Sequence, residues 1–102
     1  MEFTPPTAEQ VFALKVCAGI EELAKQDRFA AASSDLVEAI AEGIGGFAQG
    51  IWAPLNRAGD TEGATLENGV VRLPAGYAEA YQGFVEAGWG AVAAPEAFGG
   101  QA

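Results

Sequence analysis

The side chains that could do chemistry in this sequence are few and widely spaced. Cys17 is the only cysteine, and the chain contains no histidine. A cysteine nucleophile needs a neighbouring base to form its thiolate, so we expect Cys17, which stands among apolar residues in a helical pattern, to be a small buried hydrophobic residue. Glu38 and Glu42 are four residues apart on one helical face. General acid–base catalysis needs a carboxylate with a perturbed pKa in a cleft, whereas these two are expected on a solvated surface opposite the apolar stripe.

A second group of carboxylates lies in a glycine-flanked segment. Asp60 and Glu62 stand beside Gly59 and Gly63, but the ligand spacing of an EF-hand calcium loop is absent. A polar turn explains this segment. With no histidine and no dense set of oxygen ligands, we predict no metal site and no catalytic residue in this chain.

Charge and composition exclude two further classes of function. The net charge is −9, from 14 acidic and 5 basic residues, and the basic residues are scattered. Without a cationic patch we expect no nucleic-acid binding. The longest apolar stretches are far shorter than the ~20 residues that span a bilayer, and the first residues lack the features of a signal peptide. We therefore expect no membrane span and a cytoplasmic location.

The strongest helical periodicity lies at about residues 35–55. Asp35 and Glu38 there form a capping pattern at the expected helix start, and Pro54 is expected to kink or end the helix. Glycines in this helix cost about 0.5–1 kcal/mol each relative to alanine, so we expect it to be central and closely packed against another backbone. The apolar stripe consists of Leu36, Ile40, Ile44, Phe47, Ile51 and Leu55, and the glycines are Gly43, Gly45, Gly46 and Gly50.

A first helix is expected at about residues 8–25. Thr7 is a favoured N-cap, and Gln10 three residues later completes a capping box. Apolar residues recur along this segment with helical spacing. The sequence therefore predicts one continuous helix before the central one.

A β-hairpin and a third helix follow the central helix. Asn68-Gly69 between two short β-prone runs is a strong signal for a two-residue turn, which predicts a hairpin at about 65–72. The third helix is expected at about 75–87, with Gly88 as its C′ residue. Its apolar face is expected to carry Tyr77, Tyr81, Phe84 and Val85. The predicted fold is thus mainly α with one small hairpin.

The last stretch, residues 89–102, matches neither a helical nor a strand period. It holds Trp89 and Phe98, a single charged residue, and the pair Gly99-Gly100. An apolar, aperiodic segment on an acidic protein needs a cover to remain soluble. We therefore interpret residues 1–102 as one domain of a longer polypeptide.

Several short sequences in the second half of the chain form an ordered set. They are Ala53-Pro54-Leu55-Asn56-Arg57, Gly59-Asp60, Glu62-Gly63-Ala64, Asn68-Gly69-Val70-Val71, Pro74-Ala75-Gly76-Tyr77, Ala80-Tyr81, Val85-Glu86-Ala87-Gly88-Trp89 and Phe98-Gly99-Gly100-Gln101. This set resembles the N-terminal region of acyl-CoA dehydrogenases, and is most similar to the branch that includes 3-methylthiopropanoyl-CoA dehydrogenase-like enzymes. The resemblance covers nearly the whole chain, although no single motif in it is specific.

The resemblance implies an N-terminal helical domain whose parent protein also has a middle β-domain and a C-terminal helical domain, both absent here. It implies a parent enzyme with FAD that oxidises an acyl-CoA thioester to 2-enoyl-CoA, passes electrons to an electron-transfer flavoprotein and forms a homo-oligomer. The family's catalytic glutamate and most flavin contacts lie in the absent domains, so no catalytic residue is expected here and no FAD is expected on this chain alone. Phe98, Gly99 and Gly100 are the candidate substrate-binding residues, as a wall of the acyl pocket, although packing at the domain boundary is the role that we favour for them.

Two other hypotheses remain beside this one. Under the first, the chain is a self-standing acidic helical module that binds a partner protein through its apolar C-terminal residues. Under the second, it is a separately encoded small subunit that completes a dehydrogenase complex by assembly.

Overall fold

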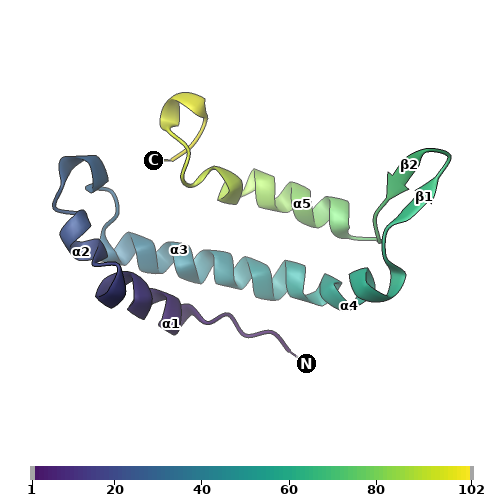
Figure 1. Cartoon of the computed structure of the whole chain (residues 1–102), viewed down its shortest axis with the longest axis horizontal. Coiled ribbons are helices and arrows are strands. Elements are labelled where there is room, and N and C mark those ends of the chain that lie inside the picture. The colour runs from purple at the N-terminus through teal and green to yellow at the C-terminus, as the bar shows by residue number, and fades with distance from the viewer. Residues whose placement is uncertain (1, 102) are drawn as a thin grey trace. The chain divides into compact units, whose positions relative to one another are not determined.

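The computed structural model describes residues 2–101, which are mainly α-helical with one two-stranded hairpin (Figure 1). The residues fall into two compact units. One unit comprises residues 4–46, and the other comprises residues 47–101 with residues 2 and 3. The expected fold class is confirmed.

The first unit begins with a helix that is broken where the sequence predicted continuity. Helix α1 spans Thr7–Phe12, a π-helical segment η1 spans Ala13–Cys17, and α2 spans Ile20–Leu23. Gly19 lies between them at φ 63°, a left-handed conformation that ends the helix. The expectation of one helix over 8–25 is therefore wrong, because it ignored the glycine. A 3₁₀ turn η2 at Asp27–Phe29 follows.

The helix starts of this unit differ by a residue or two from the expected ones. Pro6, not Thr7, occupies the N-cap of α1, and no side chain caps that end. Helix α3 spans Ser34–Phe47, and the Oγ of Ser33 accepts a hydrogen bond from the Leu36 amide at 3.3 Å. The cap at this end is thus Ser33 rather than Asp35. A serine outside the helix accepts from the third helical amide in this way, which satisfies one of the free donors of the first turn.

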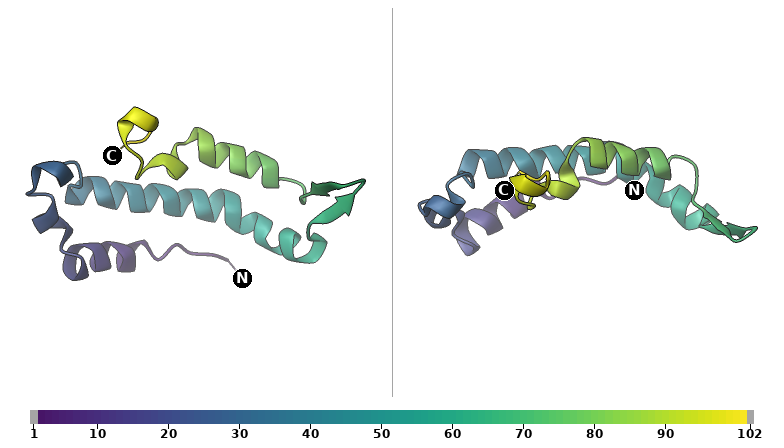
Figure 2. Two further views of the ribbon diagram at one scale, coloured as in Figure 1. Left: turned by 45° about the horizontal axis from the view of Figure 1, so that its top comes forward. Right: turned by 90° about the horizontal axis from the view of Figure 1, so that it is seen from above.

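Close packing in the first unit is concentrated at Gly45 of α3. A Cβ at Gly45 would lie 3.0 Å from the Pro5 ring and 3.2 Å from the Thr7 hydroxyl, so the extended segment before α1 contacts the helix backbone there. In Figure 2 this segment and α1 run beside α3. Ala41, one turn earlier in α3, is buried. A Cβ at Gly46 would meet nothing within 4 Å. Close packing therefore occurs at Gly45, against side chains rather than against the backbone that we expected.

The side chains of the first unit that could do chemistry lie near its surface. Glu38 is half-buried and forms an ion pair with Lys15 at 3.3 Å, so it does not lie on a fully solvated face as expected. Cys17 is exposed. The expectation that it is buried is wrong for this structure, because the π-helical segment ends at Cys17 and shifts its position relative to the apolar residues of α1.

The second unit starts with a π-helical segment followed by an α-helix. The segment η3 spans Ala48–Trp52, and α4 spans Ala53–Glu62 with Pro54 in its first turn. The amide of Ala53 donates to the Ala48 carbonyl, five residues back. Proline has no amide hydrogen and its ring clashes with the carbonyl four residues earlier; the wider π turn removes that clash. Pro54 therefore does not end the helix, which continues to Glu62.

The hairpin has the register that its turn sequence predicts. Strand β1 spans Thr65–Glu67 and β2 spans Val70–Arg72, paired antiparallel. Asn68 and Gly69 have φ values of 50° and 77°, the left-handed pair that a two-residue type I′ turn requires. The Nε of Arg72 donates to the Glu67 carboxylate at 3.0 Å. All residues of the two strands are exposed. The hairpin forms part of the connection between α4 and α5 (Figure 2).

Helix α5 spans Tyr77–Glu86, between two left-handed glycines. Gly76 has φ 90° and Gly88 has φ 79°, so the predicted C′ glycine is confirmed. The helix turns Tyr77, Ala80 and Phe84 inward, and Ala80 is buried. Tyr81 and Val85, which were expected on the same face, are exposed. The structure therefore covers only part of the apolar face that the sequence predicted for this helix.

The last residues form two short 3₁₀ turns, η4 at Trp89–Ala91 and η5 at Glu96–Phe98. Trp89 is half-buried, whereas Phe98 is 85% exposed. Across residues 2–101, no helix is both long enough and apolar enough to cross a bilayer.

Candidate functional site

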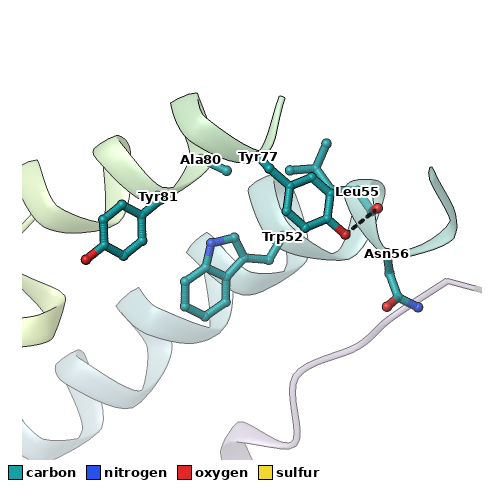
Figure 3. Close-up of a pocket in the computed structure, with 6 residues that line it drawn as sticks. All are labelled: Trp52, Leu55, Asn56, Tyr77, Ala80 and Tyr81. Carbon is teal, nitrogen blue, oxygen red and sulfur yellow. Dashed lines mark hydrogen bonds between the residues drawn. The ribbon is translucent and has the colours of Figure 1, made fainter. Parts of the chain in front are cut away.

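A groove of about 310 Å³ lies between α4 and α5 in the second unit. Figure 3 shows its walls, with the Trp52 indole between the rings of Tyr77 and Tyr81. Trp52 comes from the last position of η3, just before α4. The lining residues are Trp52, Leu55, Asn56, Tyr77, Ala80 and Tyr81.

One wall of the groove is fixed by a hydrogen bond from Tyr77. Its hydroxyl donates to the backbone carbonyl of Leu55 at 3.2 Å, in a partly buried position (Figure 3). The phenol lies directly over Gly59, where a Cβ would overlap the hydroxyl oxygen. The glycine thus leaves the space that lets a side chain of α5 reach a carbonyl of α4.

The start of α5 is held against the same turn of α4. A Cβ at Gly76 would lie 2.9 Å from the Cδ2 of Leu55. Gly76 also has a positive φ, which L-residues with side chains rarely adopt. The Leu55 side chain therefore packs on the Gly76 backbone, while its carbonyl accepts the hydrogen bond from Tyr77.

The groove is continued by a cluster of three aromatic rings. Trp52 and Phe84 are 5.0 Å apart between ring centroids, and Phe47 meets Trp52 edge-to-face at 5.3 Å and Phe84 at 6.1 Å. These distances fall within the range in which aromatic pairs stabilise one another beyond simple burial. The partners of Phe84 precede those of Tyr77 in the sequence, so α5 runs antiparallel to η3 and α4.

The sequence-based stripe did not include Trp52, because it assumed regular helical spacing. Four residues after Phe47 comes Ile51, which was assigned to the stripe. The π turn adds a residue, and the side chain that contacts Phe47 is five residues on, at Trp52. The sequence analysis also did not predict Asn56 as a groove residue, because a polar residue beside an apolar stripe has no periodic pattern that would indicate a site.

The groove offers apolar surface and little charge. None of its lining residues is acidic or basic, and Asn56 supplies the only amide side chain in its walls. Lys15, Lys25 and Arg72 each form an ion pair elsewhere, and Arg28 lies over the Phe29 ring at 5.5 Å. The groove is lined by no basic side chain, so its walls do not fit a dinucleotide pyrophosphate, which commonly needs cationic partners.

Metal chemistry has no support in the part of the chain that is described. No group of three or more histidine, cysteine, aspartate or glutamate side chains in residues 2–101 is arranged to hold a metal ion. The groove can accept an apolar or aromatic surface, and it contains no nucleophile or general base.

The three predicted substrate-binding residues lie outside this groove. Phe98 ends η5 with its ring exposed, and Gly99 follows at φ 84°. Gly100 is half-buried, and a Cβ there would overlap the carbonyl of Ala94. The three residues share one tight turn, and the glycines are used for the turn itself.

No protein-family model matches this chain. Over 100 residues, which are 98% of this chain, the sequence is 36% identical to the 3-methylmercaptopropionyl-CoA dehydrogenase of Ruegeria pomeroyi (strain ATCC 700808 / DSM 15171 / DSS-3). The chain is homologous to an acyl-CoA dehydrogenase. The resemblance seen in the sequence is thereby confirmed. The matched stretch of 100 residues contains the groove residues as well as Phe98, Gly99 and Gly100.

The homology covers only a small part of the length of the Ruegeria pomeroyi dehydrogenase. The matched stretch is 17% of the relative's length. The mainly helical fold with one hairpin agrees with the helical domain that the acyl-CoA dehydrogenase resemblance implied.

Proposed function

We propose that this chain is the N-terminal helical part of an FAD-dependent acyl-CoA dehydrogenase, in which it packs against other domains and does no chemistry itself. The parent enzyme oxidises an acyl-CoA thioester to 2-enoyl-CoA. The observation that carries the proposal is the 36% identity to a dehydrogenase over 98% of this chain.

The lack of reactive groups supports a non-catalytic role for these residues. The chain has no histidine, and the groove contains no carboxylate. We propose that the proton-abstracting group and most of the flavin site come from other residues of the parent.

The packing role is supported by the apolar side chains that the second unit leaves in contact with solvent. Trp52 is 41% exposed, Tyr81 68% and Phe98 85%. Contiguous exposed apolar side chains mark a contact with protein or ligand, and Trp52 and Tyr81 share one groove. We propose that the aromatic groove and the turn at Phe98 meet the remaining domains of the parent.

The finer assignment concerns the turn formed by Phe98, Gly99 and Gly100. We propose that it contributes a wall of the acyl pocket, with domain packing as the alternative role. Its support is the exposed Phe98 ring and the place of this turn within the homologous stretch.

We also propose that the parent is a cytoplasmic homo-oligomer that binds acyl-CoA and passes electrons to an electron-transfer flavoprotein. Support for these partners comes from the homology to a dehydrogenase. Size-exclusion chromatography and cell fractionation of the parent test the oligomeric state and the location.

The proposal is tested on the complete polypeptide that contains this chain. That protein should show the visible absorbance bands of bound flavin and should reduce an artificial electron acceptor when acyl-CoA thioesters are added. The isolated 102-residue chain should show neither property. Stoichiometric flavin on the isolated chain, or a complete polypeptide that does not oxidise acyl-CoA, would contradict the proposal.

The packing role has a separate test, in which one charge is added at two positions of α5. Tyr81→Glu should lower the melting temperature of the complete polypeptide, because a carboxylate would be buried at the contact. Ala78→Glu adds the same charge at an exposed position facing away from the inward stripe, and should leave the melting temperature nearly unchanged. Equal effects from the two variants would show that α5 has no covered face near Tyr81.

Three other measurements separate the two remaining hypotheses: the oligomeric state of the isolated chain, co-purification and the reading frame. A self-standing interaction module would oligomerise as the isolated chain, and replacing Trp89 and Phe98 with polar residues would abolish that association. A separate small subunit would co-purify with a dehydrogenase encoded by another gene, and the reading frame would not continue into a β-rich domain.

A further inference from the structure

We draw no further inference here: the strongest candidate, the aromatic groove between α4 and α5 lined by Trp52, Leu55, Asn56, Tyr77, Ala80 and Tyr81, is an apolar surface for which nothing in the structure shows what covers it beyond the packing role already proposed.

Discussion

Tyr77 at the start of α5 donates its hydroxyl hydrogen bond to the main-chain carbonyl of Leu55 in α4, at 3.2 Å. The contact joins residues 22 positions apart and is partly buried. A helix carbonyl has two lone pairs, so it can accept from a phenol in addition to its helical partner. The bond is possible because Gly59, one turn further along α4, has no side chain under the phenol.

Removal of the Tyr77 hydroxyl should weaken the second unit without changing its fold. Tyr77→Phe is expected to lower the free energy of unfolding by about 0.5–1.5 kcal/mol, the usual net value of one hydrogen bond. Urea denaturation followed by circular dichroism measures it. The control is Tyr81→Phe, since Tyr81 is exposed and an exposed substitution should change stability by less than about 0.5 kcal/mol. Equal losses in both variants would show that the Leu55 contact contributes nothing.

A methyl group on Gly59 should displace the Tyr77 ring. Alanine is the better helix former by about 1 kcal/mol, but at Gly59 its Cβ overlaps the phenol, so Gly59→Ala should destabilise the chain despite that gain. At Gly46 of α3 there is open space, and Gly46→Ala should stabilise by about 0.5–1 kcal/mol.

The two changes at this contact should also be non-additive. Once Tyr77→Phe has removed the hydroxyl, Gly59→Ala should cost less than it does in the unaltered chain, because residues in contact couple. A double-mutant cycle by urea denaturation measures the difference. Strict additivity would mean that the ring does not sit over Gly59.

Phe84 should contribute more to stability than a solvent-exposed phenylalanine. It contacts both Phe47 and Trp52, so Phe84→Leu is expected to cost about 1–2 kcal/mol through lost ring contacts and packing. Because Trp52 is 5.0 Å from that ring, its fluorescence should also change. Phe98→Leu is the matched control, as Phe98 is 85% exposed; it should change unfolding by less than about 0.5 kcal/mol.

The turn at the end of η5 should be sensitive to a side chain at Gly100. There a Cβ overlaps the Ala94 carbonyl, a backbone atom that cannot rotate away, so Gly100→Ala is expected to cost about 1–3 kcal/mol of local stability. Gly99 has open space and φ 84°, so Gly99→Ala should cost only the left-handed penalty of about 1–2 kcal/mol. Hydrogen exchange of the Gly100 amide, which donates to the Pro95 carbonyl at 3.1 Å, measures both. A Gly100→Ala variant with unchanged exchange would contradict the turn as described.

The local elements could be predicted where a short run of residues determines the backbone. Asn68 and Gly69 tolerate the left-handed conformation that a two-residue turn needs, and the hairpin formed there. Gly88 ended α5 for the same reason. Gly19 carried an equal signal at the break between η1 and α2, and the prediction failed only because apolar periodicity was given more weight.

The groove was determined by contacts between residues distant in the chain, which no local pattern encodes. A π turn before Pro54 changed which residue of the helix meets Phe47. The place of the Tyr77 ring against α4 depends on Gly59, because a Cβ there would overlap the phenol. By itself, therefore, the sequence indicated the resemblance to acyl-CoA dehydrogenases, the helical class and the turns at Asn68-Gly69 and Gly88, because those depend on residue types and short spacings. Only the tertiary structure decided which aromatic rings form the groove, because that depends on the helical register and on the space left by a glycine in another helix.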